Sequence, residues 1–172
     1  MTVTTQFGES FVGEGLNAAH INTVLGAKGG PVETAWVTAL ATPRAGHVAF
    51  VATAAPGVPL QPMTLFVNKA TIEGGRHGEL TWGAAVAGVA GGVCDALSDG
   101  DIEQSQATGL LLIVAVWVNP AADSDQLIYS NNRMATATAL RNGNQGRPDV
   151  DSVLAAGVAP WNAFFKPGHD TP

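Results

Sequence analysis

Nine consecutive apolar residues, LLLIVAVWV at positions 110–118, constrain the fold of this chain more than any other segment. The run is short and rich in β-branched side chains, which favours a strand over a buried helix. No polar residue alternates with the apolar ones, so both faces of such a strand must be covered. We therefore predict a central strand at 110–118 that anchors the core.

Four more β-prone stretches supply neighbours for that strand. They are bounded by Gly, Pro or Asn, as strands commonly are. A short turn with two glycines joins the first two stretches, which predicts a hairpin. Three prolines in PGVPLQP, which follows the third stretch, exclude a regular ladder of hydrogen bonds there. The expected strands are residues 10–13, 19–25, 47–55 and 64–68.

Two segments carry the first helical signals. Pro31, with Glu33 in the first turn, begins a helix that is expected to run to about residue 42. Residues 80–97 are rich in alanine but also contain repeated glycines. Each glycine costs about 0.5–1 kcal/mol relative to alanine in a helix interior. A helix at 80–97 must therefore be held by close packing of small residues, against the sheet or against another subunit.

A third helix is expected at residues 123–141, beginning near Asp123 or Ser124. The sequence RNGNQGRP, which starts at Arg141, ends it. The amphipathic pattern gives this helix one inward face. The candidate inward positions are Leu127, Met134, Ala135 and Leu140.

The order of these elements describes an α+β fold, with a mostly antiparallel sheet and helices packed on one face. A length of 172 residues fits a single domain, residues 1–172, in which residues 143–172 form a C-terminal tail. Aromatic residues in that tail suggest that part of it docks on the domain or on a neighbouring subunit. These residues are Trp161, Phe164 and Phe165.

Composition narrows the classes of partner. A net charge of -6, with only eight Lys and Arg, argues against a nucleic-acid partner. No apolar run approaches the roughly 20 residues that span a bilayer, and the first ten residues lack a signal-peptide pattern, so we expect no membrane partner and a cytoplasmic protein. A chain that is 46% apolar and 13% charged also favours a homo-oligomer.

Two segments carry a family resemblance. Residues 19–34 (AHINTVLGAKGGPVET) join a histidine-bearing strand to a glycine-rich loop and a helix start, and residues 68–71 read NKAT. Together they resemble the formaldehyde-activating enzymes, with a match that extends from about residue 13 to residue 118. Members of that family are lyases that condense formaldehyde with the reduced pterin carrier tetrahydromethanopterin. The resemblance implies these two small molecules as the substrates of this chain.

The resemblance also implies a fold and an assembly. Formaldehyde-activating enzymes are similar in fold to the second domain of ribosomal protein S5, and they assemble as homopentamers with active sites at subunit clefts. Tetrahydromethanopterin is a cosubstrate, so no tightly bound cofactor is implied. His47 and His77 match no metal-ligand spacing, and we predict no metal. Trp36, Trp82 and Trp117 are expected to be core or subunit-contact residues.

His20 is the candidate catalytic residue. It matches the histidine of the family motif A-H-I-D, which is assigned as a proton donor. Formaldehyde and an amine form a carbinolamine, whose hydroxyl must be protonated before water leaves and an iminium forms. An imidazole can donate that proton near neutral pH. The simpler alternative is a histidine that hydrogen-bonds within a half-buried strand.

Lys69 and Thr71 match family positions that contact the pterin. Lysine supplies a positive charge and three donors, and threonine supplies a compact donor and acceptor. A desolvated Lys69 could instead attack an aldehyde directly and form a Schiff base. Without the resemblance, Lys69 would read as a solvated residue at a strand end and Thr71 as an ordinary β-former.

Three other substrate-binding positions depart from the family pattern. Asn22 replaces an aspartate, which removes a carboxylate beside the histidine, and Val86 replaces a glutamine. Val51 replaces a leucine of the substrate wall, which opens a little space. These changes leave two alternatives open: condensation of an aldehyde with another amine carrier, or a noncatalytic protein that binds a pterin or an aldehyde.

Overall fold

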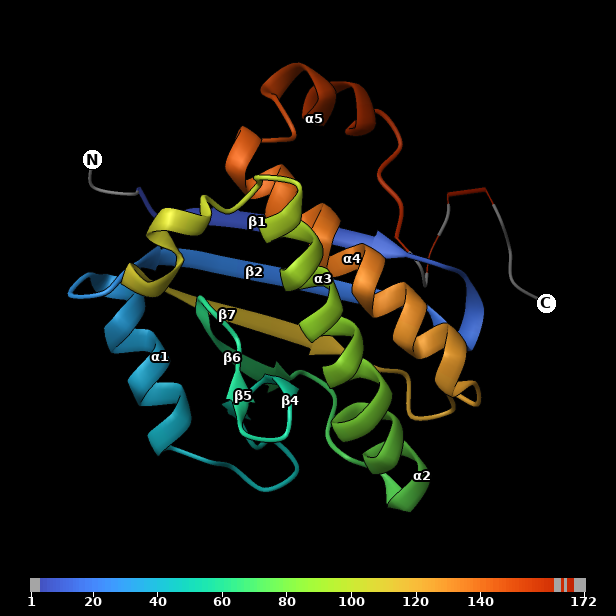
Figure 1. Ribbon diagram of the computed structural model, residues 1–172. Helices are drawn as coiled ribbons and strands as arrows, with labels where there is room; N and C mark the ends of the chain where they lie inside the picture. Colours follow the sequence, from blue (N-terminus) through green and yellow to red (C-terminus); the bar gives the residue numbers. More distant parts are fainter. Residues whose placement is uncertain (1–3, 163–164, 166, 169–172) are drawn as a thin grey trace.

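The computed structural model describes residues 4–162, 165 and 167–168 of the chain (Figure 1). Its centre is a five-stranded sheet with β7 in the middle, as the apolar run predicted. Neighbouring strands are antiparallel except β6 and β7, which are parallel. In sheet order, the strands are β1 (Gln6–Val12), β2 (Ala19–Ala27), β7 (Leu110–Trp117), β6 (Met63–Asn68) and β3 (Phe50–Val51).

Two long helices cover one face of this sheet (Figure 1). They are α3 (Val86–Ser98) and α4 (Asp125–Gln145). Leu112 and Val114 of β7 are fully buried in the core between the sheet and these helices. The predicted α+β class, with a mostly antiparallel sheet and helices packed on one face, is confirmed.

Helix α1 (Pro31–Ala41) contributes to a second, smaller apolar cluster. Its residues Val32 and Trp36 pack with Leu111, which alternates along β7 with the residues that face α3 and α4. The helix begins at Pro31, as predicted, and Glu33 accepts a hydrogen bond from the Gly29 N–H (2.9 Å). The sheet face beneath α1 is the face that carries the candidate site.

Helix α3 continues a helical segment that begins with α2 (Gly74–Glu79) and a π-helical turn (Leu80–Ala85). The prediction of a helix at 80–97 is therefore confirmed. By length and composition alone, residues 74–98 could cross a membrane, with a mean hydropathy of 1.4. Val89 and Val93, however, are fully buried in the main core. The segment is a core helix of the domain.

Two glycines explain how a helix with this composition is held. A Cβ added at Gly88 would lie 2.5 Å from the carbonyl oxygen of Tyr129, and one at Gly92 would lie 2.5 Å from that of Arg133. Both oxygens belong to the backbone of α4. The close packing expected from the sequence is therefore confirmed, but the tight partner at these glycines is α4 of the same chain, neither the sheet nor another subunit.

The prediction of a single strand at 47–55 is wrong. Only β3 pairs with β6 in the main sheet. Residues Thr53–Ala55 (β4) pair with Val58–Pro59 (β5) in a separate two-stranded sheet. The reason is a reverse turn at Gly57, whose φ of 77° suits glycine and folds the chain back on itself. Two short 3-10 helices complete the connections, at Gly15–Asn17 and Gln104–Gly109.

Two of the inward positions predicted for α4 are also wrong. Leu127 and Met134 are 49% and 58% exposed, whereas Ala135 and Leu140 are buried as expected. Successive helical residues are rotated by about 100°. Ile128, one residue beyond Leu127, therefore takes the inward place and is fully buried.

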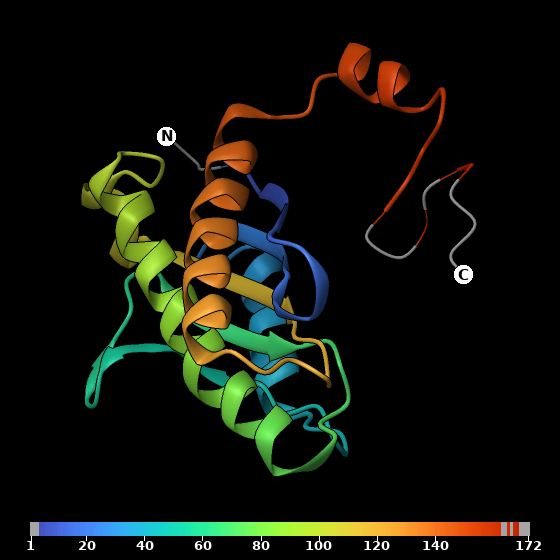
Figure 2. The ribbon, with the colours of Figure 1, turned by 90° about the vertical axis from the view of Figure 1, so that its right-hand side faces the viewer.

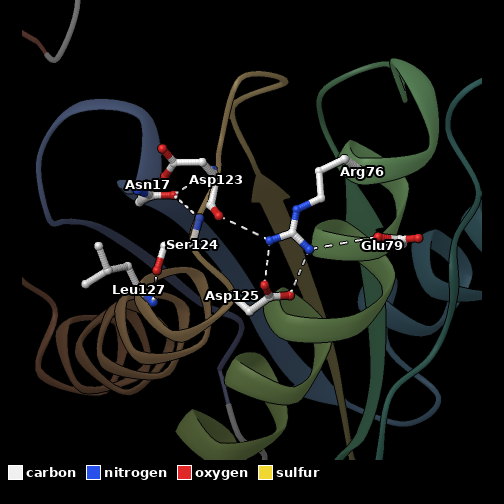
Figure 3. Close-up of polar contacts among 7 residues, drawn as sticks. All are labelled: Asn17, Arg76, Glu79, Asp123, Ser124, Asp125 and Leu127. Atoms are coloured by element: carbon white, nitrogen blue, oxygen red, sulfur yellow. Dashed lines mark hydrogen bonds and ion pairs between the residues drawn. The ribbon is translucent and has the colours of Figure 1, made fainter.

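Asn17 ties the turn before β2 to the start of α4 (Figure 3). Its side-chain amide donates to Asp123 Oδ1 (2.8 Å), and its Oδ1 accepts from the N–H groups of Asp123 and Ser124 (both 3.1 Å). Ser124 is the N-cap of α4, and its hydroxyl accepts from the N–H of Leu127 (3.3 Å), in agreement with the predicted start. Because His20 follows Asn17 by three residues, these contacts fix the beginning of the strand that carries it.

Arg76 joins α2 to the same helix start (Figure 3). Its guanidinium donates to Asp125 Oδ1 (3.2 Å) and to the carbonyl oxygen of Asp123 (3.2 Å), and it lies 3.8 Å from Glu79. The hydrogen bond from Arg76 lowers the pKa of the Asp125 carboxyl below its ordinary value. The pair is exposed, so its main effect is to orient the two helices.

The C-terminal segment extends away from the sheet (Figure 2). It contains helix α5 (Val150–Ala156), and none of residues 147–162 is buried. Trp161 and Phe165 are 64% and 62% exposed, while Phe164 lies outside the described residues. Docking of these aromatic residues on a neighbouring subunit stays a prediction.

Candidate functional site

The β1–β2 hairpin places a carboxylate beside His20. In its register Phe11 faces His20 and Glu9 faces Asn22, so Glu9 is the diagonal neighbour of His20 on the same face. Glu9 Oε1 lies 3.0 Å from His20 Nε2, and the two side chains are 59% and 43% exposed. A carboxylate at this distance can accept a hydrogen bond from an imidazole N–H. His20 is therefore a partly exposed candidate site residue whose ring Glu9 orients.

Three side chains cross the sheet in one row at this edge. His20 of β2 is paired directly with Trp117 of β7, and both point to the same face. Lys69 follows the end of β6, where its N–H donates to the carbonyl oxygen of Val116 (2.7 Å). Strand spacing puts the backbones of His20 and Lys69 about 10 Å apart. The partly exposed Trp117 lies between them.

The structure brings most of the predicted site residues to this face. Asn22 is exposed two residues along β2 from His20, and Val51 lies half-buried in the cluster beneath α1. Val86 is placed elsewhere. It is 8% exposed on α3 and packs in the core on the opposite face of the sheet. Within one chain, Val86 therefore does not approach His20.

Thr71 is held by a second histidine. His47 Nδ1 lies 3.1 Å from the carbonyl oxygen of Asn68, and its Nε2 lies 3.0 Å from Thr71 Oγ1. A carbonyl oxygen can only accept, so Nδ1 carries the proton, and in the neutral ring Nε2 accepts from the Thr71 hydroxyl. The lone pairs of Thr71 then remain available to accept a hydrogen bond from a ligand.

Asn68 fixes the loop that carries this histidine. Its side-chain amide is 2% exposed and donates to the carbonyl oxygens of Gly46 and Ala70 (both 2.8 Å). Its Oδ1 accepts from the N–H of Val48 (3.1 Å). The asparagine of the NKAT segment thus builds the loop, its threonine contacts His47, and its lysine lies at the end of β6 beside the candidate site.

A pocket of about 380 Å³ opens beside Lys69. The carboxyl end of α1 forms one wall, and the loop before β3 and the end of β6 form the others. Its lining includes Thr42, Arg44, His47, Val67, Asn68 and Lys69. No carboxylate lines this pocket within the described part of the chain.

The third histidine that the structure describes, His77, has a structural role. His77 is 1% exposed, and its Nδ1 accepts from the N–H of Glu73 (3.0 Å). Its Nε2 therefore donates to the carbonyl oxygen of Val118 (3.0 Å). Both ring nitrogens are satisfied, so His77 joins α2 to the end of β7 and takes no part in the site.

Two residues of this face were missed in the sequence. The predicted first strand began at residue 10, so Glu9 lay outside it, although the alternation of a strand one residue longer would have placed it beside His20. Trp117 was expected in the core or a subunit contact because it ends an apolar run. The two other tryptophans expected in the core do contact it: Trp36 of α1 is buried, and the ring of the half-buried Trp82 lies 5.4 Å from that of Phe50.

Comparison with known proteins identifies the family. The formaldehyde-activating enzyme (Fae) family matches residues 7–163 of this chain. The chain belongs to the formaldehyde-activating enzyme family. The match covers the strands, the helices and the row of His20, Trp117 and Lys69, and it confirms the resemblance on which His20 was selected.

Relatives within this family fall into two types. A 5,6,7,8-tetrahydromethanopterin hydro-lyase of Methanosarcina barkeri is 38% identical over 148 residues, which cover 86% of this chain and 83% of that protein. Bifunctional Fae/Hps enzymes of Methanosarcina mazei and Archaeoglobus fulgidus are 34% and 35% identical. Each of those matches covers 87% of this chain but only 38% of the longer protein.

Proposed function

We propose that this chain is a hydro-lyase that accelerates the condensation of formaldehyde with tetrahydromethanopterin to methylene-tetrahydromethanopterin. The observation that carries the proposal is the His20–Glu9 pair on the open sheet face, with Lys69 and Thr71 at the same edge. The relative named a tetrahydromethanopterin hydro-lyase, which this chain matches over most of its length, supports the choice of substrates. No metal or resident cofactor is required for this chemistry.

His20 acts as general acid in the proposed reaction. An amine nitrogen of the pterin adds to formaldehyde and gives a carbinolamine. Protonated His20 then donates its proton to the carbinolamine hydroxyl. The C–O bond breaks as water leaves, and an iminium forms. A second pterin nitrogen attacks the iminium carbon and loses its proton, which closes the methylene bridge. Glu9 orients the imidazole for the transfer through the 3.0 Å contact with Nε2.

The binding residues follow from the same face. Lys69 and Thr71 contact the pterin, Asn22 faces its donor groups, and Val51 forms part of the wall. Val86 would reach this substrate only from a neighbouring subunit, because it lies on the opposite face of its own sheet. This requirement agrees with active sites placed between subunits.

We further propose a homo-oligomer, a homopentamer by family resemblance, with a fold similar to the second domain of ribosomal protein S5 and a cytoplasmic location. Exposed apolar side chains beside the site support the assembly: Phe7 and Phe11 of β1 are 70% and 40% exposed. Both share a sheet face with Glu9 and His20. Native mass spectrometry tests the subunit number, and a monomer would contradict the proposal.

The deciding experiment measures methylene-tetrahydromethanopterin formation against a no-enzyme control, because formaldehyde and amines react spontaneously. We expect wild type to exceed the background rate and His20→Ala to lose about 10²–10⁴-fold of that acceleration. Thermal unfolding and pterin binding of His20→Ala should stay close to wild type, since the side chain is partly exposed. An unchanged rate in His20→Ala would contradict the assignment of the general acid.

A second candidate function is condensation of an aldehyde with another amine carrier. Asn22 favours it, because the family aspartate at this position would hold the donor edge of the pterin more strongly than a neutral amide does. The matched variant is Asn22→Asp. A wild type that is inactive with tetrahydromethanopterin, together with an active Asn22→Asp, would select this alternative. Saturable binding without rate enhancement in both proteins would indicate a noncatalytic binding protein.

A further inference from the structure

Arg44 and Lys69 bring two positive charges to one pocket of a protein with a net charge of -6. Three arginines elsewhere in this chain are neutralised by carboxylates: Arg76, Arg133 and Arg141 each form an ion pair with an aspartate. Neither Arg44 nor Lys69 has an ion pair among the described residues. An acidic protein therefore leaves these two charges unneutralised at the same place.

Two other surface pockets show the contrast. The pocket that contains Arg133 and Arg141 also contains Asp95 and Asp99. The pocket that contains Arg147 also contains Glu9 and Asp149. The pocket beside Lys69 instead combines two cations with a histidine, and no carboxylate of the described chain lines it. Its field favours an anion.

Hydrogen bonds hold the backbone turn that carries Arg44 and His47. Arg44 and His47 exchange two backbone hydrogen bonds across a tight turn (3.0 and 2.9 Å). Gly46 within the turn has a φ of 73°, and its carbonyl oxygen accepts from the buried amide of Asn68 (2.8 Å). Rigid placement lowers the entropy cost of binding.

We propose that this pocket is an anion-binding site for a phosphate or carboxylate group, held by Arg44 and Lys69. A guanidinium can grip either group with two parallel hydrogen bonds, and the lysine ammonium adds a second charge. His47 shapes the floor, since both of its ring nitrogens already contact Asn68 and Thr71. Arg44 is not among the positions that the family resemblance assigns to the substrate.

The proposal bears on substrate choice through Lys69, which also stands in the row with His20. The anion is either an acidic group of the amine carrier or a free oxyanion. The carrier as source of the anion rests on the proposed function, whereas a free oxyanion does not. In both cases the guanidinium of Arg44 binds a negatively charged oxygen group.

The first test is calorimetric titration of the full chain with inorganic phosphate and, separately, with glutarate at low ionic strength. We expect saturable binding of at least one anion with a Kd of about 1 mM, weakened about tenfold or more in Arg44→Gln. The Kd of Arg44→Lys should lie between those of wild type and Arg44→Gln, because lysine keeps the charge but loses the bidentate geometry. Arg147→Gln is the matched control, and its Kd should equal that of wild type.

A second measurement identifies the source of the anion. If phosphate raises the KM for tetrahydromethanopterin at constant kcat, and Arg44→Gln abolishes this competition, the site holds an acidic group of the carrier. If phosphate binds without competing, the site holds a free oxyanion. Absence of saturation by both anions at about 50 mM, or an equal Kd in wild type and Arg44→Gln, would overturn the proposal. The calorimetric titration measures anion binding without turnover, so its result does not depend on the proposed reaction.

Discussion

The carboxylate of Glu9 lies 3.0 Å from the imidazole of His20, across two neighbouring strands. The sequence alone suggested that Asn22 had removed the negative charge beside this histidine. The hairpin instead supplies a carboxylate from β1, because Glu9 is the diagonal neighbour of His20 in the β1–β2 register. A carboxylate therefore lies beside the proposed general acid despite the substitution at Asn22.

Replacement of Glu9 should affect the rate through His20. We expect Glu9→Gln to lower kcat by about three- to tenfold, because an exposed carboxylate contributes a modest charge interaction. The same substitution in a His20→Ala background should change nothing further, and this double-mutant cycle separates coupling from a general effect. Glu14→Gln, an exposed carboxylate in the adjacent turn, is the control. Additive losses in the cycle would show that Glu9 acts independently of His20.

Trp117 should act as a flat surface for the pterin ring. It lies between His20 and Lys69 on the open face, and stacking of a heterocycle on an aromatic side chain is worth about 1–3 kcal/mol. Trp117→Ala should raise the KM for the pterin about tenfold or more, while Trp117→Phe should preserve most of the affinity. A fall in kcat with no change in KM for either variant would argue against stacking.

Gly92 should tolerate no side chain. A Cβ there would lie 2.5 Å from the carbonyl oxygen of Arg133, which is backbone and cannot move aside, so Gly92→Ala should destabilise the fold by about 1–3 kcal/mol. Gly83→Ala is the matched control. Nothing lies within 4 Å of its added Cβ, and the change should be neutral or stabilising by up to about 1 kcal/mol. Urea unfolding of both variants measures their free energies of unfolding. Equal values for Gly92→Ala and Gly83→Ala would refute the tight contact.

The ion pair between α3 and α4 should make stability depend on pH. Arg133 donates two hydrogen bonds to Asp95 (both 2.7 Å), which lowers the pKa of that carboxyl. A carboxyl with a lowered folded-state pKa stabilises the fold above its unfolded pKa of about 3.9, and this stabilisation is lost as the pH falls through the folded value.

The corresponding variant is Asp95→Asn. At pH 7 it should lower Tm by about 3 °C or less, as expected for a partly exposed pair. The difference from wild type should shrink as the pH falls below about 3.9. Glu14 has no ion pair among the described residues, so the Tm of Glu14→Gln should match that of wild type at pH 7 and below about pH 3.9. A Tm difference for Asp95→Asn that stays constant with pH would contradict the linkage.

The order and type of the main elements could be read from the sequence because their causes are local. The apolar run of β7, Pro31 at the start of α1 and Ser124 at the start of α4 each act on their own segment. The motif around His20 likewise identified the family from residues close together in the chain. Tertiary pairing overrode such signals at 47–55, where Asn68 holds the loop and Gly57 turns the chain back.

Contacts between distant residues were decided by the tertiary structure alone. The sequence by itself determined that the chain is an α+β member of its family, with His20 as the candidate acid. Strand register decided that Glu9 and Trp117 join His20, since a shift of one residue would turn both side chains to the other face. The loop anchored by Asn68 likewise brought Arg44 to Lys69, 25 positions away in the sequence. Pairings of this kind depend on how separate segments meet, and no local preference encodes them.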